Sequence, residues 1–253
     1  MKSLAKRQDK AYRKHLVSLW LSGFIFLSSS AFIFAFAYAH HRGEEVKQLI
    51  GDMQQIKSGM NSDEELGKLS KKYGGTFYTA SGHEEPRRTD GRYELRISGP
   101  FIVIRNHFFH VPGQRPWTVL ATFDVNDGTL DGALLVAAVM RSDGVILQGF
   151  TGINFKNLFR NLEPSYAVLE PHITGPPTEA VNVHLRPGAT AEQIRRAFDI
   201  NFQCLTGLRG CQHVCELMPS AWEDLPLEKR LHYADGHENV IDSECRTALG
   251  LRR

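Results

Sequence analysis

Hydrophobic and polar positions divide the chain into four parts, of which the first is a long apolar run. Leu16 to Ala39 contains no charged side chain, and residues 1–15 before it hold six Lys or Arg and one acid. As a helix, this run rises about 1.5 Å per residue and reaches roughly 36 Å, enough to cross a hydrocarbon core of about 30 Å. The basic residues predict that the N-terminus stays in the cytoplasm. We therefore expect a cytoplasmic basic segment at 1–15, a transmembrane signal anchor at 16–39 and an exported chain beyond it.

Cleavage of the apolar run is the alternative hypothesis. Ala37 and Ala39 are small residues of the kind that precede a signal-peptide cleavage point. Signal peptides, however, use an apolar stretch of about 7 to 15 residues, and this one is clearly longer. The length favours an uncleaved anchor over a secreted protein cut near Ala39, and both hypotheses export the rest of the chain.

The second part has helical periodicity. Apolar residues recur at spacings of three and four from residue 46 to residue 60, which predicts an amphipathic helix that packs on its own domain, or else on a membrane surface or a second copy. Ser62 and Glu65 then form a capping-box pattern, and Gly74 stands where the helix should stop. The pattern indicates two consecutive helices joined at residues 59–61.

The third part changes to a period of two, which is typical of strands with one polar face. Residues 92–98 and 117–125 alternate in this way, with Tyr93 and Trp117 on the apolar sides, and residues 133–140 are apolar throughout. Turn signals of the Asp-Gly type stand between the runs, so neighbouring strands are expected to form hairpins. We predict an antiparallel β-meander with residues 133–140 as its central strand, followed by a strand at 180–186 with Val181, Val183 and Leu185 inward.

The fourth part returns to helical spacing and carries every cysteine. Thr190 and Gln193 form another capping-box pattern, followed by a helical stripe from Ile194 to Leu205, and the residues beyond Pro219 are more polar. The predicted fold class is thus α+β, with a transmembrane helix, two helices, an antiparallel meander and a C-terminal helical segment with disulfides. We expect one exported domain at 44–253, whose cysteine-containing helical part is 190–253.

Charge narrows the range of partners. Beyond residue 15 the chain has 24 basic and 27 acidic side chains. Binding of nucleic acid needs clustered Lys and Arg against the phosphates, so no nucleic-acid partner is expected. None of the nine asparagines begins an Asn-x-Ser/Thr sequon, which agrees with a bacterial envelope.

Four cysteines, all beyond the apolar run, favour disulfides in an oxidising compartment. Three connectivities exist for Cys204, Cys211, Cys215 and Cys245, and we choose Cys204 with Cys211 and Cys215 with Cys245. Gly207 and Gly210 supply the turn that the short step needs. Zinc is the competing hypothesis because His213 lies between two of the cysteines, but the close C-x-x-C pairs of structural zinc sites are absent from the sequence.

Other candidate chemistry is weak. Residues 124–128 resemble part of a calcium loop, but their spacing fails the EF-hand pattern, and a hairpin turn explains the same letters. His107 and His110 lack a third ligand at a diagnostic spacing, so no metal site and no cofactor are expected. If the chain is an enzyme, the best polar cluster lies in the C-terminal tail, where an acid could orient an imidazole. That cluster is His232, Asp235 and His237.

One resemblance adds to this picture. The single N-terminal span, the capped helix that ends in YGG and the segment NFQCLTGLRGCQHVCELMPSAW together resemble a group of uncharacterised bacterial single-span membrane proteins. The resemblance covers roughly residues 44–222. It implies export and a shared fold, and it brings no activity with it.

The functional prediction follows from an anchor without a recognisable catalytic set. We expect a membrane-anchored extracytoplasmic domain that binds an envelope protein or a small ligand, or assists assembly there, and that is held by the lipid bilayer through Leu16 to Ala39. The expected location is the cell membrane, with the C-terminal domain periplasmic or extracellular. An exported enzyme, with hydrolysis as the default reaction, is the alternative, and the sequence leans away from it.

Overall fold

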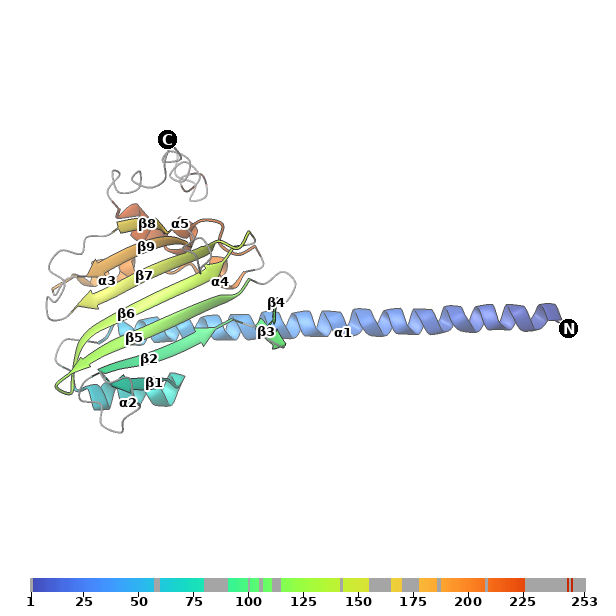
Figure 1. Ribbon diagram of the computed structural model, residues 1–253, viewed down its shortest axis with the longest axis horizontal. Coiled ribbons are helices and arrows are strands. Elements are labelled where there is room, and N and C mark those ends of the chain that lie inside the picture. The colour runs from blue at the N-terminus through green and yellow to red at the C-terminus, as the bar shows by residue number, and fades with distance from the viewer. Residues whose placement is uncertain are drawn as a thin grey trace.

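The computed structural model describes residues 2–56, 60–79, 91–99, 101–104, 107–110, 115–141, 143–154, 165–169, 178–185, 188–207, 209–225, 245 and 247. It confirms the predicted α+β class, with a long apolar helix at the N-terminus, a sheet and short helices after it (Figure 1). The elements in chain order are α1 (Lys2–Met53), α2 (Ser62–Tyr73), β1 (Thr76–Thr79), β2 (Gly91–Ser98), β3 (Phe101–Ile104), β4 (His107–His110), β5 (Trp117–Asn126), β6 (Thr129–Met140), β7 (Ile146–Asn154), β8 (Ser165–Leu169), β9 (Thr178–Leu185), α3 (Ala191–Ala197), α4 (Phe202–Thr206), α5 (Val214–Leu217) and α6 (Pro219–Glu223).

The longest element, α1, joins the apolar run and the first amphipathic helix into one helix of 52 residues. Figure 1 shows it projecting from the domain toward the N-terminus. Its apolar side chains are exposed in the projecting part, as at Trp20 (75% exposed), and buried at its C-terminal end, as at Leu49 (0%). The boundary that the sequence places between residues 39 and 44 therefore lies inside a continuous helix.

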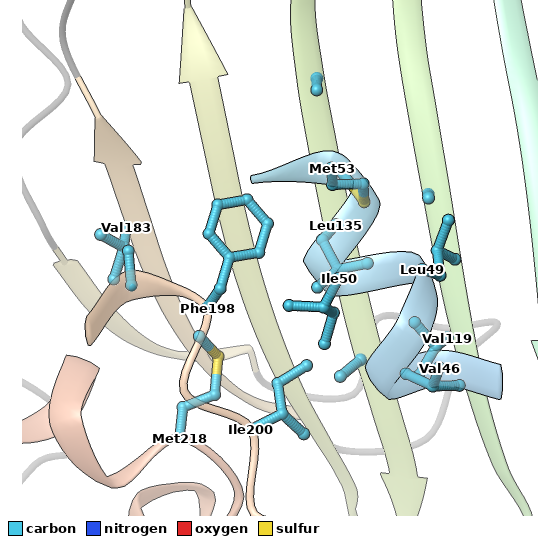
Figure 2. Packing of buried hydrophobic residues seen from close by; sticks show 14 of the residues in the cluster. Val46, Leu49, Ile50, Met53, Val119, Leu135, Val183, Phe198, Ile200 and Met218 are labelled. Atoms are coloured by element: carbon cyan, nitrogen blue, oxygen red, sulfur yellow. The ribbon is translucent and has the colours of Figure 1, made fainter. Parts of the chain in front are cut away.

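The C-terminal turns of α1 pack on the sheet because their apolar residues share one face of the helix. Val46, Leu49, Ile50 and Met53 follow the spacing of three and four, and all are buried. Figure 2 shows these side chains against β5 and β6, the strands that carry Val119 and Leu135, with Phe198, Ile200 and Met218 beside them. One continuous helix thus carries the anchor candidate and part of the core of the domain.

The start of α2 corrects the predicted capping box. Asn61, rather than Ser62, is the N-cap, and its side chain accepts a hydrogen bond from the Glu64 N–H at 3.2 Å. A β-bridge to Thr129 holds Asn61 in an extended conformation, whereas the Ser62 hydroxyl donates to the Gly128 carbonyl at 2.9 Å. The predicted end at Gly74 is confirmed, since Gly74 has φ 75° directly after the last helical residue.

The main sheet has seven strands in the order β1-β2-β5-β6-β7-β9-β8, and β3 and β4 form a separate two-stranded sheet. The pairs from β1 to β7 in this order are antiparallel, as the meander prediction requires, and β6 is the central strand. The two tightly joined strands β5 and β6 meet at Asp127 and Gly128, whose φ angles of 49° and 67° are typical of a two-residue hairpin turn. The hairpin interpretation of residues 124–128 is therefore confirmed.

One pairing goes beyond a meander. Strand β9 lies between β7 and β8, parallel to β7 and antiparallel to β8. Its inward residues are those predicted, since Val181, Val183 and Leu185 are buried. Alternation within a strand determines which side chains face the core, but it carries no information on which neighbour the strand pairs with.

The C-terminal helices cover the same face of the sheet as α1. The capping box at Thr190 and Gln193 is present, but the predicted stripe from 194 to 205 is split into α3 and α4. Asn201 causes the break, because its N–H donates to the Leu217 carbonyl and its side chain caps the next helix at the Cys204 N–H. Ala197 and Leu205 still reach the core.

Candidate functional site

The face of the main sheet away from α1 is the candidate interaction surface, and it is called the outer face below. Figure 1 looks onto this face, and no described helix lies in front of it. Most of its side chains are partly or fully exposed. They are Arg92, Glu94, Arg96 and Ser98 of β2, Thr118, Leu120, Thr122 and Asp124 of β5, Leu134, Val136, Ala138 and Met140 of β6, Gln148, Phe150 and Gly152 of β7, and Asn182 and His184 of β9.

The centre of the outer face is apolar, and polar side chains of β2 and β9 flank it on two sides. Leu120 pairs with Val136, and Val136 pairs with Phe150, so that three apolar side chains form a row across β5, β6 and β7. The register extends this row to Arg96 on one side and to Asn182 on the other. An apolar centre with a polar rim, rather than uniform hydrophobicity, is the usual composition of a protein interface.

His184 is a residue of this face that the sequence search missed. A Cβ on Gly152, its pairing partner in β7, would come 2.8 Å from the His184 Nδ1, so glycine makes room for the imidazole. Burial lowers the pKa of His184 below its usual value and so favours the neutral form of the ring. The alternation of β9 could have located this histidine on the polar side, but only the register of β7 and β9 places it beside Gly152.

The disulfide prediction is confirmed in both its pairs. Cys204 is bonded to Cys211 and Cys215 to Cys245, with Cα–Cα distances of 4.7 and 5.8 Å. Gly210 adopts φ 66° within the short loop, and a Cβ there would lie 2.6 Å from the Arg115 side chain. With all four thiols in disulfides, they are not available as zinc ligands.

A charged cluster joins the disulfide segment to the sheet. Arg141, at the end of β6, donates to Asp143 at 2.6 Å, to the Glu179 carboxylate at 3.1 Å and to the Gln212 carbonyl at 3.1 Å. In the sequence, Gln212 lies between Cys211 of one disulfide and Cys215 of the other. One guanidinium thus connects a hairpin turn, an interior strand and the cysteine-containing helices.

The titration of this cluster indicates a structural role. The hydrogen bond from Arg141 lowers the pKa of Asp143 to about 2. Burial raises the pKa of Glu179, while the charges of Arg141 and His213 oppose that rise. Glu179 is 9% exposed and accepts a hydrogen bond from Arg141, so this carboxylate is part of the contact between β9 and the end of β6.

The remaining predicted residues divide into two groups. His232, Asp235 and His237 lie outside the described residues, so that the proposed polar cluster stays a prediction. His107 and His110 are the first and last residues of β4. Across the part of the chain that the structure describes, no three His, Cys, Asp or Glu side chains form a metal-binding group.

Comparisons of the chain with protein-family models, with curated proteins and with solved structures found no match. Membership of the single-span group that the sequence resembles therefore stays a prediction, and the geometry of the chain is the basis for a function.

Proposed function

We propose that the chain is a single-pass membrane protein whose exported α+β domain is a binding or assembly module of the bacterial envelope. The observation that carries this proposal is the division of α1 into an exposed apolar part and a part that is buried in the core of the domain. Water would oppose the exposure of an apolar helix surface of this length, and a bilayer would favour it.

The continuity of α1 supports an N-terminal anchor that is not cleaved from the mature protein. Ala39, the last residue before the alternative cleavage point, lies within the helix and is 1% exposed. Proteases cut exposed, extended segments far more readily than buried helical ones. Removal of residues 1–39 would also uncover the side of the domain against which Ala39 packs.

The disulfides and the basic residues support one orientation. Disulfides persist in oxidising compartments and are rare in the cytosol, so the pairs at 204–211 and 215–245 fit a domain outside the cytoplasm. The six Lys and Arg within residues 1–15 fit an N-terminus that stays inside.

The outer face supports binding rather than catalysis. The row of Leu120, Val136 and Phe150 is open to solvent in part, and charged residues such as Arg92 and Asp124 pair with each other at its edge at 3.0 Å. A protein partner with a matching apolar strip and polar margin is the ligand that this surface fits. We propose that the outer face is where the envelope partner binds.

Anchoring and orientation are tested on the full chain in cells. The protein is expected to stay with membranes after alkaline extraction, to retain residues 1–39, and to show activity of a C-terminal reporter that works only outside the cytoplasm. The matched control is a triple variant with fewer positive charges before the span, Lys10→Gln, Arg13→Gln and Lys14→Gln. Because these charges keep the N-terminus in the cytoplasm, the variant is expected to reduce reporter activity several-fold. A mature protein that begins at His40 would contradict the anchor.

Binding is tested by a photo-reactive amino acid at position 150. Irradiation of intact cells is expected to give one discrete cross-linked product, which the added substitution Val136→Lys abolishes by placing a charge in the centre of the outer face. The same photo-reactive residue at position 126, in the hairpin turn, is the control and is expected to give no such product. Equal cross-linking from positions 150 and 126, or no effect of Val136→Lys, would rule out the outer face as the binding surface.

A further inference from the structure

The face of α1 that enters the domain core continues into the apolar segment. Ala35 and Ala39, four residues apart on one face, are 6% and 1% exposed. On the opposite side of the same turns, Ile33 and Phe34 are 67% and 73% exposed. The domain therefore covers one side of α1 well before the apolar segment ends.

The positions at which the domain covers α1 can be converted into depths in the bilayer. If Leu16 to Ala39 crosses the membrane, Ala35 lies about 6 Å inside the outer end of the span, at about 1.5 Å per residue. Phe32, at 38% exposure, is also partly covered and lies roughly 10 Å inside. Some of the domain must then sit at the depth where acyl chains meet headgroups, and its surface there should be apolar.

The two-stranded sheet of β3 and β4 lies at the end of the domain from which α1 projects, and its sequence is mostly apolar. Figure 1 shows both strands beyond the ends of the main sheet, level with the projecting part of α1. Six of their eight residues are apolar, in the sequences FIVI and HFFH. Ile102 pairs with Phe109 and Val103 with Phe108, so apolar positions oppose each other across the ribbon.

Physical constraints restrict how such a ribbon can meet lipid. An isolated two-stranded sheet is marginally stable in water, and its unpaired backbone edges would be costly in the centre of a bilayer. Four-residue strands extend only about 13 Å, too short to cross. A short ribbon of this apolar composition suits the interface, where acyl chains begin and where water and headgroups can satisfy its backbone edges.

We propose that the β3–β4 ribbon is a second membrane contact that inserts into the outer leaflet. This proposal rests on the anchor proposed above and deepens it. Two contacts, one spanning and one interfacial, determine the tilt and rotation of the domain on the bilayer. The outer face of the sheet then has a defined orientation relative to the membrane, whereas a domain held by a single span could rotate about it.

The test places an environment-sensitive fluorophore on single introduced cysteines in the full chain. The four native cysteines are all in disulfides, so only the new thiol reacts. The ribbon variants are Ile102→Cys and Val103→Cys, because successive positions of a strand face opposite sides. Phe34→Cys in α1 is the membrane control, and Asn126→Cys in the β5–β6 turn is the aqueous control. Each protein is placed in nanodiscs of phosphatidylethanolamine and phosphatidylglycerol, with or without lipid that carries a nitroxide near the headgroup end of its acyl chain.

The expected result is that nitroxide lipid quenches at least one ribbon label to about the same extent as the Phe34 label, and leaves the Asn126 label unchanged. Quenching at Phe34 without quenching at either ribbon position would overturn the ribbon contact and leave the anchor standing. A blue-shifted ribbon label that nitroxide does not quench would indicate cover by protein, such as a second copy, and would also overturn it. Absence of quenching at Phe34 would refute the anchor itself.

Discussion

Replacement of Arg141 by alanine is expected to lower the free energy of unfolding by about 3 kcal/mol, because it removes one partner of a partly buried ion pair. The substitution leaves the Glu179 carboxylate, which is 9% exposed, without the guanidinium that donates to it at 3.1 Å. It also removes the donor to the Gln212 carbonyl, and with it a link between the sheet and the disulfide segment. Urea denaturation of the full chain in nonionic detergent, followed by tryptophan fluorescence, measures the change, since Trp117 and Trp222 are buried in the domain.

The matched control is the double variant Arg141→Ala, Glu179→Gln. A neutral amide needs no cation, so the double variant is expected to recover at least half of the lost stability. If Arg141→Ala destabilises the fold only because the side chain becomes smaller, the double variant will recover no stability. Full stability in the single variant would contradict the structural role assigned to the cluster.

The loss in Arg141→Ala should also depend on pH. Burial already raises the pKa of Glu179, and removal of the opposing guanidinium charge raises it further. A carboxyl whose folded pKa exceeds its unfolded pKa favours the fold while protonated, and that contribution is lost as the pH rises through the folded value. Asp143, whose pKa Arg141 lowers from 3.8 to about 2, adds a loss that is fully present above its ordinary pKa, so it does not differ between mildly acidic and neutral pH. The variant is therefore expected to lose less stability at mildly acidic pH than at neutral pH.

Removal of the Cys215–Cys245 disulfide is the second large effect. This bond closes a loop of 30 residues, and the loop-closure model assigns it about 3.7 kcal/mol. The variant Cys215→Ala, Cys245→Ala is preferable to a serine pair, because both cysteines are fully buried and a hydroxyl would lack a partner there. Denaturant unfolding in detergent, at a pH that is held constant, measures the expected loss.

The other disulfide is the matched control for this effect. Cys204–Cys211 closes a loop of only seven residues, for which the same model gives about 2.3 kcal/mol. Cys204→Ala, Cys211→Ala should therefore be the milder of the two double variants. An equal or larger loss from the shorter loop would show that contacts in the folded state, and not the entropy of the unfolded chain, dominate the contribution of these bonds.

Local chemistry was sufficient to predict many of the elements. An uncharged stretch from 16 to 39, the alternation around Tyr93 and Trp117, and the Asp127-Gly128 turn are each determined by neighbours in the sequence. The disulfide pairing belongs here too, because Gly207 and Gly210 allow the short loop to close and the remaining two cysteines then pair. Patterns of this kind depend on backbone geometry over a few residues, which the sequence displays directly.

The candidate site depended on contacts between distant parts of the chain. A capping-box pattern marked Ser62, but the bridge from Asn61 to Thr129 moved the cap by one residue. Arg141 carries no local motif, and its partners lie 38 and 71 residues further along the chain. Such contacts form only when the fold brings the groups together, and pair preferences in a single sequence are too weak to identify them.

The sequence by itself determined the long apolar N-terminal helix, the α+β class and the inward faces of the strands that alternate, since periodicity reflects which side chains are buried. The tertiary structure alone decided that α1 is continuous from the apolar segment into the core, and that β9 enters beside β7. It also decided which side chains stand together on the outer face. The physical reason is that side-chain alternation specifies a face but no neighbour, and a helical stripe specifies a surface but not what covers it. Those choices are made by the packing of the whole domain, where Ala39 is buried and Trp20 is left exposed on the same helix.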